Sequence, residues 1–409
     1  MSTEKTKLPI ISASFLVLGN CLGVGVLALP VKTGLAGFVP ALSAIILIWL
    51  TMLISALVIA YRIGSQEHFD IPSFYHQEIG HIGKWLAIIC NLIILYGVLV
   101  AYLSGVSTLV ISLFQISMPQ WAVVFIYFCI TTALIMFGMN ALRKENVLIV
   151  TAIWISFGIL IFTGVKKFDT HVLFSTYDWR YMSMGLPIAV SAFHFHNIIP
   201  TVCRAVKHDF RAASKAIFLG VFLGLIINTV WVIVVLGTLP ESGPGIDTIY
   251  NASLKNWPAT VPMSQLLHSK VFTTAGLAFA VLAVTASFMA NGTGLFGFIG
   301  DLTHTYLKKD SALLTGALSF LPPLVITLIY PDIFLSALSM VGGIGETILF
   351  AILPAIILFK LSKNKFGYLA ITGYIMFLIG LYVTLFVTGQ KLGFIDLQPR
   401  PPQAVVAEK

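Results

Sequence analysis

Two histidines and one glutamate lie deep inside long apolar runs of this chain. His194 and His196 stand two residues apart in the run 181–206, and Glu346 stands in the run 332–360. Ionisable side chains at such positions are costly in a membrane and usually functional. Histidine exchanges protons near neutral pH, so we predict His196 and Glu346 as proton-coupling residues. The alternative is structural, with each side chain satisfied by nearby backbone.

Two of the apolar runs carry strong helix-breaking signals. The first, 8–31, has Gly19, Gly23 and Gly25 within seven residues, and 181–206 has Pro200 shortly after His196. Glycine weakens a helix by about 1 kcal/mol, and proline removes a backbone hydrogen bond. Freed N–H groups suit a carboxylate and freed carbonyls suit an ammonium, so two broken helices predict a site for a zwitterion such as an amino acid. The alternative is that the glycines only allow close helix packing.

The elements that must position these residues are long apolar helices. Continuous runs of about 20 residues can each cross a bilayer, and they are too long for the strands of a membrane barrel. We expect an all-α polytopic membrane protein with eleven transmembrane helices, at 8–31, 38–61, 85–114, 118–142, 147–165, 181–206, 213–240, 269–300, 312–330, 332–360 and 366–389.

The interrupted runs are the first and the sixth, which predicts two five-helix repeats. A repeat of odd length must be inverted in the membrane, and paired interrupted segments of this kind indicate a transporter binding site. The expected organisation is a cytoplasmic N-terminus, two inverted repeats, an eleventh helix and a polar C-terminal tail, at 1–7, 8–166, 181–360, 366–389 and 390–409.

The composition agrees with a membrane protein. The chain is 58% hydrophobic and only 10% charged, whereas a soluble domain carries roughly 25% charge. This excludes a soluble enzyme, a disordered chain and a fibrous protein. The net charge of +8 is explained by basic cytoplasmic loops and not by nucleic-acid binding. The same rule places the N-terminus in the cytoplasm and the C-terminus outside.

Several motifs together resemble the hydroxy and aromatic amino acid permease family, the bacterial tyrosine- and tryptophan-specific permeases. The run from Gly19 to Pro30, G-N-C-L-G-V-G-V-L-A-L-P, is similar to the family's G-x-x-I-G-A-G-M-L-A-x-P. The run from Ser191 to Pro200 is similar to its S-F-x-F-H-x-x-x-P, and Tyr102 lies in a matching A-Y-L-S-G. The resemblance covers nearly the whole chain.

The resemblance implies the leucine-transporter fold of the amino acid–polyamine–organocation superfamily, with substrate held between the first, third, sixth, eighth and tenth segments. The substrate-binding residues expected on these segments are Asn20, Gly23, Gly25, Tyr102, Phe193, His194, His196, Ser287 and Phe288. His194 stands where the family commonly has glycine. The lysine that some proton-coupled relatives carry in the fifth segment has no counterpart at 150–153.

The predicted function is secondary active import of an aromatic amino acid, tyrosine first, by proton symport and alternating access. The expected location is the bacterial inner membrane, with the lipid bilayer and the amino acid as partners and no nucleic acid, metal or enzymatic activity. The sequence leaves the oligomeric state open, a monomer included. A sodium-coupled carrier is the alternative, with Thr285 in the polar stretch of 269–300 as coupling residue. A carrier for tryptophan, or for neutral amino acids in general, is a second alternative.

Overall fold

The computed structural model describes residues 4–21, 23, 25–63, 70–114, 117–137, 139–243, 248–364 and 366–397, with backbone alone for 4–8, 137 and 139–150. Every regular element in these ranges is helical, which confirms the all-α class. The predicted N-terminal segment 1–7 and tail 390–409 fall partly outside the described residues.

The α-helices follow the predicted apolar runs, with short helices in the connections. They are α1 Glu4–Cys21, α2 Gly25–Gly34, α3 Phe38–Ile63, α4 Ile71–Ile79, α5 His81–Phe114, α6 Gln120–Phe137, α7 Met139–Gly164, α8 Thr170–Leu173, α9 Met182–Ala192, α10 Ile199–Ala205, α11 Phe210–Leu236, α12 Ile249–Leu254, α13 Thr260–Leu267, α14 Lys270–Leu302, α15 Ala312–Ile329, α16 Phe334–Met340, α17 Leu353–Leu361 and α18 Tyr368–Lys391. Single turns of 3-10 helix are η1 Val165–Lys167, η2 Trp179–Tyr181 and η3 His196–Ile198, and π-helical stretches are η4 Thr303–Leu307, η5 Val341–Glu346 and η6 Ile348–Ile352.

The protein has the helices of a multi-pass membrane protein. In the described part of the chain, eight helices are long and apolar enough to cross a membrane, and α1 with α2 gives a ninth if the bent pair is one span. The predicted number of eleven stays a prediction.

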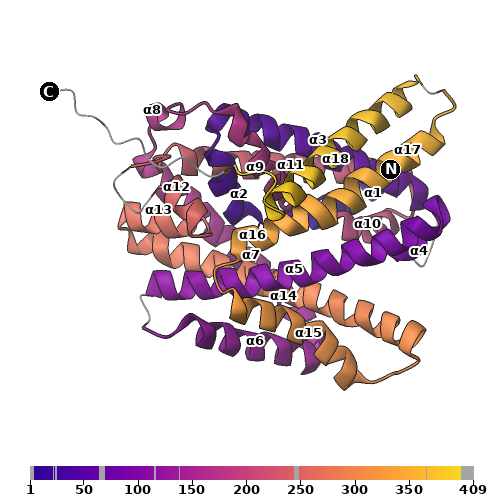
Figure 1. Ribbon diagram of the computed structural model, residues 1–409, viewed down its shortest axis with the longest axis horizontal. Coiled ribbons are helices and arrows are strands. Elements are labelled where there is room, and N and C mark those ends of the chain that lie inside the picture. The colour runs from indigo at the N-terminus through magenta and orange to yellow at the C-terminus, as the bar shows by residue number, and fades with distance from the viewer. Residues whose placement is uncertain are drawn as a thin grey trace.

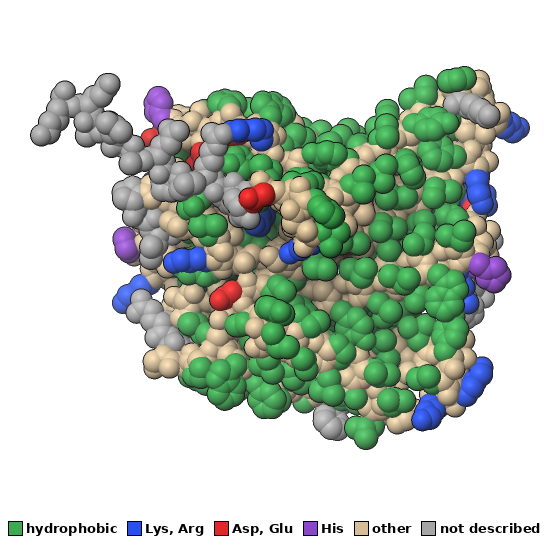
Figure 2. All heavy atoms as spheres, viewed as in Figure 1, with side chains coloured by type: hydrophobic (Ala, Val, Ile, Leu, Met, Phe, Trp, Pro, Cys, Tyr) green, Lys and Arg blue, Asp and Glu red, His purple; other side chains and the backbone are tan. Residues whose placement is uncertain are grey.

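The helices are arranged around α5 and α14, which pack against each other through the middle of the molecule (Figure 1). The helices α6 and α15 lie on one side of them. The helices α1, α4 and α10 lie at one end, called here the α4 end, and α8, α12 and α13 lie at the opposite, α8 end. Hydrophobic side chains cover most of the visible face, and lysines and arginines gather toward the two ends (Figure 2). This distribution suits a molecule whose middle lies in lipid.

Both predicted breaks are present as departures from regular helix. The axis turns by 56° between Pro9–Cys21 and Gly25–Gly34. In the sixth segment α9 ends at Ala192, and regular structure resumes only at η3 and α10. Pro200 stands near the start of α10, where its missing N–H costs no helical hydrogen bond.

A third irregular region lies in the tenth predicted segment. The glycine-rich stretch Val341–Glu346 is π-helical, and the hydroxyl of Thr347 donates to the carbonyl of Gly342 at 2.5 Å. Short π-helical stretches inside longer helices often occur at functional sites.

Candidate functional site

A cavity of about 250 Å³ lies where the two breaks meet α5, α14 and η5. This volume is far above the roughly 10–15 Å³ that one water needs on the same measure, so the cavity has room for one small molecule. The lining residues are Gly19, Asn20, Gly23, Gly25, Val98, Tyr102, Ser191, His194, Asn197, Ala286, Ser287, Ala290, Asn291, Leu338 and Glu346.

One wall of the cavity holds a buried acid–base cluster. Nδ1 of His194 lies 2.6 Å from Oε1 of Glu346, and the hydroxyl of Ser191 donates to Oε2 of Glu346 at 2.9 Å. The side chain of Glu346 is 1% exposed and that of His194 is 15% exposed. A carboxylate this deeply buried needs partners for both oxygens, and these two residues supply them.

Glycines bring this wall together. A Cβ added at Gly342 would lie 1.8 Å from the carbonyl oxygen of Pro187, and one added at Gly345 would lie 2.7 Å from Ile94. Real Cβ atoms essentially never lie this close to another heavy atom. At Gly342 the clash is with backbone, so that position needs glycine, whereas at Gly345 the side chain of Ile94 would have to shift. The absence of side chains lets η5 pack tightly against α9 and α5.

The opposite wall carries a hydrogen-bonded amide. Nδ2 of Asn291 donates to the hydroxyl of Tyr102 at 3.3 Å and to the carbonyl of Ser287 at 3.0 Å. Both amide hydrogens are thereby used, which leaves Oδ1 as a hydrogen-bond acceptor of this wall. Ala286 and Ala290, one turn apart on α14, add a flat apolar surface beside it.

The structure places most of the predicted site residues on this one cavity. They are Asn20, Gly23, Gly25, Tyr102, His194, Ser287 and Glu346. These residues come from five separate predicted segments, so the fold gathers them as the sequence predicts.

Four predicted residues do not line the cavity. Phe193 is fully buried, and Phe288 packs edge-on against Tyr127, with ring centroids 5.9 Å apart. The hydroxyl of Thr285 lies 3.1 Å from that of Tyr127, on α6. His196 is 1% exposed and stacks on Phe350 at 4.4 Å.

Helical geometry explains why Thr285 and Phe288 of α14 do not line the cavity. Successive residues are turned by about 100°, so Thr285 and Phe288 point away from the face that presents Ser287 and Asn291. At the break, the residues Phe193 and His196 instead pack into the protein interior.

The sequence analysis did not single out Ser191, Asn197 or the alanines of α14 as site residues. Ser191 lies three residues before His194, close to one helical turn, and that spacing is a signal that could have found it. The alanines have no functional group that would mark them in the sequence, because they contribute to the site only through their small size.

The cavity is closed toward the α8 end. A Cβ at Gly25 would lie 2.8 Å from the Cα of Ala192, so α2 and α9 are in backbone contact there. Toward the α4 end, Gly19 and Asn20 are exposed, as are Gly294 and Gly297 along the cavity-facing side of α14. The accessible side of the cavity therefore faces the α4 end.

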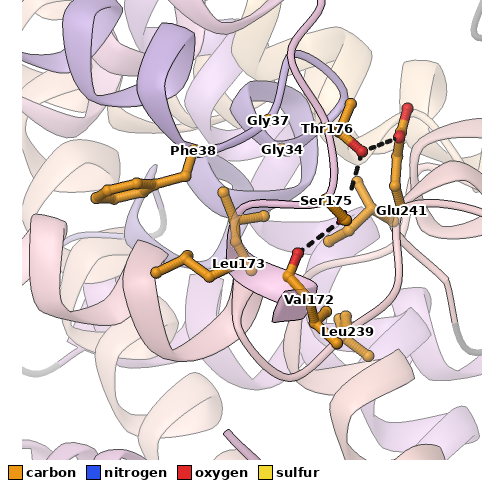
Figure 3. A pocket seen from close by; sticks show the side chains of 11 residues that line it. Gly34, Gly37, Phe38, Val172, Leu173, Ser175, Thr176, Leu239 and Glu241 are labelled. Carbon is orange, nitrogen blue, oxygen red and sulfur yellow. Dashed lines mark hydrogen bonds between the residues drawn. The ribbon is translucent and has the colours of Figure 1, made fainter. Parts of the chain in front are cut away.

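A second, much smaller cavity lies among the connections at the α8 end (Figure 3). Its volume of about 10 Å³ admits roughly one water. The hydroxyl of Thr176 donates to the carboxyl of Glu241, and Gly37, at φ 82°, packs against the carbonyl of Thr176. Burial raises the pKa of the Glu241 carboxyl, and the bond from Thr176 opposes that shift. This cavity is a small gap where helix ends and connecting segments pack together.

The described residues contain no group of three or more histidine, cysteine, aspartate or glutamate side chains that could hold a metal ion. The larger cavity offers hydrogen-bonding groups and the His194–Glu346 cluster.

Residues 6–389 match the tryptophan/tyrosine permease family. The chain belongs to this family. A tryptophan-specific transport protein of Shigella flexneri is 25% identical over 391 residues, which cover 90% of each chain. The tyrosine-specific transport system 1 of Haemophilus influenzae is 26% identical over 340 residues, covering 81% of this chain and 83% of the relative.

The fold is similar to that of a solved transporter. The crystal structure of a manganese transporter from Eremococcus coleocola has a TM-score of 0.60 with this family member, at 16% identity, and the match covers 98% of this chain and 90% of the other. The likeness at this identity concerns the fold alone.

Proposed function

We propose that this protein is a secondary active transporter that imports an aromatic amino acid, with tyrosine as the first candidate and tryptophan as the second. The observation that carries the proposal is the cavity between the two helix breaks, in a chain of the tryptophan/tyrosine permease family. Relatives named for each of the two amino acids match most of the chain, so they support both substrates.

The breaks offer complementary groups to a zwitterion. The helix α2 begins at cavity-lining Gly25, and the positive end of its dipole suits the substrate carboxylate. The last turn of α9 ends beside cavity-lining Ser191, and its carbonyls suit the ammonium. The aromatic ring fits against Ala286, Ala290 and Leu338, where small side chains leave room for it.

The transport cycle is alternating access, in two inverted five-helix repeats followed by an eleventh helix. With the α4 end in the cytoplasm of a bacterium, the cavity faces inward and the contact between Gly25 and Ala192 closes the outer path. The basic residues Arg204 of α10, Lys207 of the turn that follows and Arg211 of α11 support this orientation, because α10 lies at the α4 end.

The coupling ion is a proton in this proposal. The buried cluster of His194 and Glu346 on the cavity wall supports it, because these groups exchange protons. The sodium alternative relies on Thr285, whose hydroxyl is engaged by Tyr127 and stands off the cavity wall.

Uptake into proteoliposomes tests the proposal. Labelled tyrosine should accumulate under an imposed pH gradient without sodium, and unlabelled tyrosine or tryptophan should compete better than leucine or alanine. Accumulation that follows a sodium gradient at constant pH, and is lost in Thr285→Ala, would favour the sodium carrier. Equal competition by all neutral amino acids would contradict the aromatic assignment.

A further inference from the structure

His194 and Glu346 form a pair whose geometry suits the storage of one proton. The two side chains are 2.6 Å apart, and the cluster is completed by Ser191. All three lie on the cavity wall. They belong to the two irregular regions of the bundle, the end of α9 and the π-helical η5, where the backbone departs from regular helix.

The hydrogen-bonding groups of the pair have partners in two protonation states. With one proton on Nδ1, His194 donates to one carboxylate oxygen of Glu346 and Ser191 donates to the other, so the charge of −1 has two donors. One further proton, taken from water on one side of the membrane and returned to water on the other, makes the pair neutral. No covalent bond of the substrate changes. A carrier that closes over a zwitterion and a neutral pair then buries no net charge.

The free nitrogen of His194 links the proton to the substrate. Nε2 of His194 is buried and has no hydrogen-bond partner among the described residues. A doubly protonated ring carries an N–H there that needs an acceptor, and rotation of the ring during the transport cycle would turn it toward a substrate carboxylate in the cavity. Because such coupling is reciprocal, the proton and the substrate each favour the binding of the other.

The surroundings offer few competing proton sites. Among the elements packed against η5, α9 and α16 carry no titratable side chain. The stretch η6 carries no titratable side chain; α5 carries His81, Lys84, Cys90, Tyr96 and Tyr102, and α18 carries Tyr368, Tyr374, Tyr382 and Lys391. Of these, Tyr102 lines the cavity. Tyrosine and cysteine side chains are ordinarily neutral at pH 7. His196, on η3, is stacked between Phe350 and Phe195 and has no acidic partner among the described residues.

We propose that the His194–Glu346 pair, positioned by Ser191, holds the single coupling proton of the transport cycle. This assignment rests on the proposed function, and it names the group by which that function is driven. It transfers the coupling role predicted for His196 to His194 and keeps the role predicted for Glu346.

Two transport assays separate the proton from the substrate. Exchange of labelled tyrosine between equal pools needs only the loaded carrier, whereas proton influx on tyrosine addition, read by a pH dye inside sodium-free proteoliposomes, needs the coupling site. The variants are Glu346→Gln and His194→Gln. The matched controls are Asp310→Asn and His304→Gln, because His304 and Asp310 form a similar pair, 2.8 Å apart, that is largely exposed and outside the cavity.

The expected result is a split between the two assays. Tyrosine exchange should fall in both cavity variants because the pair lines the cavity, whereas proton influx for each tyrosine taken up should fall at least about tenfold because the linked site is lost. Both controls should behave as the wild type. Wild-type proton influx per tyrosine in the two cavity variants would overturn the assignment, and so would a wild-type protein that takes up tyrosine without proton influx.

A measurement on the wild type alone covers variants that fail to fold. When the detergent-solubilised protein binds tyrosine in weakly buffered solution, it should take up protons. Binding that takes up no protons across the whole range from about pH 5 to about pH 8 would overturn the assignment. A wild type that exchanges neither tyrosine nor tryptophan would instead contradict the proposed function itself.

Discussion

Gly342 of η5 lies directly against the backbone of Pro187 in α9, since a Cβ at Gly342 would be 1.8 Å from the carbonyl oxygen of Pro187. The same hypothetical Cβ would be 2.7 Å from the hydroxyl of Ser191. This contact therefore sets the distance at which Ser191 meets Glu346 across the two helices. Glycine at position 342 in η5 thus determines how closely Ser191 of α9 approaches Glu346.

Gly342→Ala should disrupt this wall. The added methyl group can be accommodated only by moving backbone, and overpacking of this kind costs about 1–3 kcal/mol. We expect lower thermal stability and at least about a tenfold loss of tyrosine exchange, because both oxygens of Glu346 lose their geometry. Gly316→Ala is the control, since its Cβ would make only ordinary contacts at 3.8 Å. Normal exchange in Gly342→Ala would show that the cluster tolerates separation of the two helices.

Leucine at the two glycines of the first break should have different effects. A Cβ at Gly23 meets nothing closer than the carbonyl of Asn20 at 3.7 Å, so in Gly23→Leu the side chain grows into the cavity. That variant should fold and insert normally but lose stabilisation by tyrosine in a thermal-shift assay. Gly25→Leu should fail earlier, at the level of folded protein, because its Cβ would lie 2.8 Å from the backbone of Ala192.

The result for Gly23→Leu is decisive for the position of the substrate. If tyrosine still raises the melting temperature of that variant as in the wild type, the substrate does not occupy the space in front of Gly23. Size-exclusion profiles of both variants separate loss of binding from loss of folding.

Asn291→Leu should reduce selectivity for rings that donate a hydrogen bond. Oδ1 of Asn291 is an acceptor on the cavity wall, and both the hydroxyl of tyrosine and the indole N–H of tryptophan are donors. Phenylalanine lacks a donor and leaves the amide unpaired, so the wild type should prefer tyrosine over phenylalanine by roughly 10- to 100-fold. The preference should largely disappear in the variant when inhibition constants are measured in the exchange assay.

Asn228→Leu is the matched control for this experiment. Asn228, like Asn291, donates from Nδ2 to the carbonyl four residues earlier on its own helix, and it lies outside the cavity. Its preference for tyrosine over phenylalanine should equal that of the wild type. An unchanged preference in Asn291→Leu would assign recognition of the ring to another group.

Glu241→Gln should stabilise the protein in a pH-dependent way. Burial holds the pKa of this carboxyl above its ordinary value of 4.5, so the folded state binds the proton more tightly than the unfolded state. Stability from this group is therefore gained as the pH falls and lost as it rises above the ordinary pKa. Glutamine keeps an acceptor for Thr176 without the buried charge.

The measurement is the melting temperature of both proteins across the pH range. The variant should be the more stable at about pH 7.5, and the difference should shrink toward about pH 5. Asp310→Asn, at an exposed site, should show no such trend. A variant that is less stable than the wild type at high pH would mean that the bond from Thr176 outweighs the cost of burial.

The breaks were predictable because their causes are local. Clustered glycines at Gly19–Gly25 and the proline at Pro200 weaken a helix wherever the segment lies. The apolar runs likewise report burial in lipid by their length. These two signals were enough to predict the helical class and the positions of the breaks. Most of the seven predicted residues that line the cavity were named from the family resemblance.

The partners within the site were not predictable from local signals. Whether His194 or His196 meets Glu346 depends on the path of three non-helical residues, Phe193 to Phe195, and on the packing of η5. The π-helical stretch depends on close contacts with α5 and α9 that no short sequence pattern encodes. Thr285 and Phe288, by contrast, could have been separated from Ser287 by the 100° step of the helix.

The chain distance between the members of the acid–base cluster has a consequence for biogenesis. Ser191 and Glu346 are 155 residues apart, so the segment that contains Glu346 leaves the ribosome long after its partners are in the membrane. A charged residue at a helix centre costs about 2.5–3.5 kcal/mol on insertion. The segment Phe334–Leu361 offsets this with a mean hydropathy of 2.1. Membrane integration of this segment thus depends on its own apolar residues, and the histidine acts only after the helices have assembled.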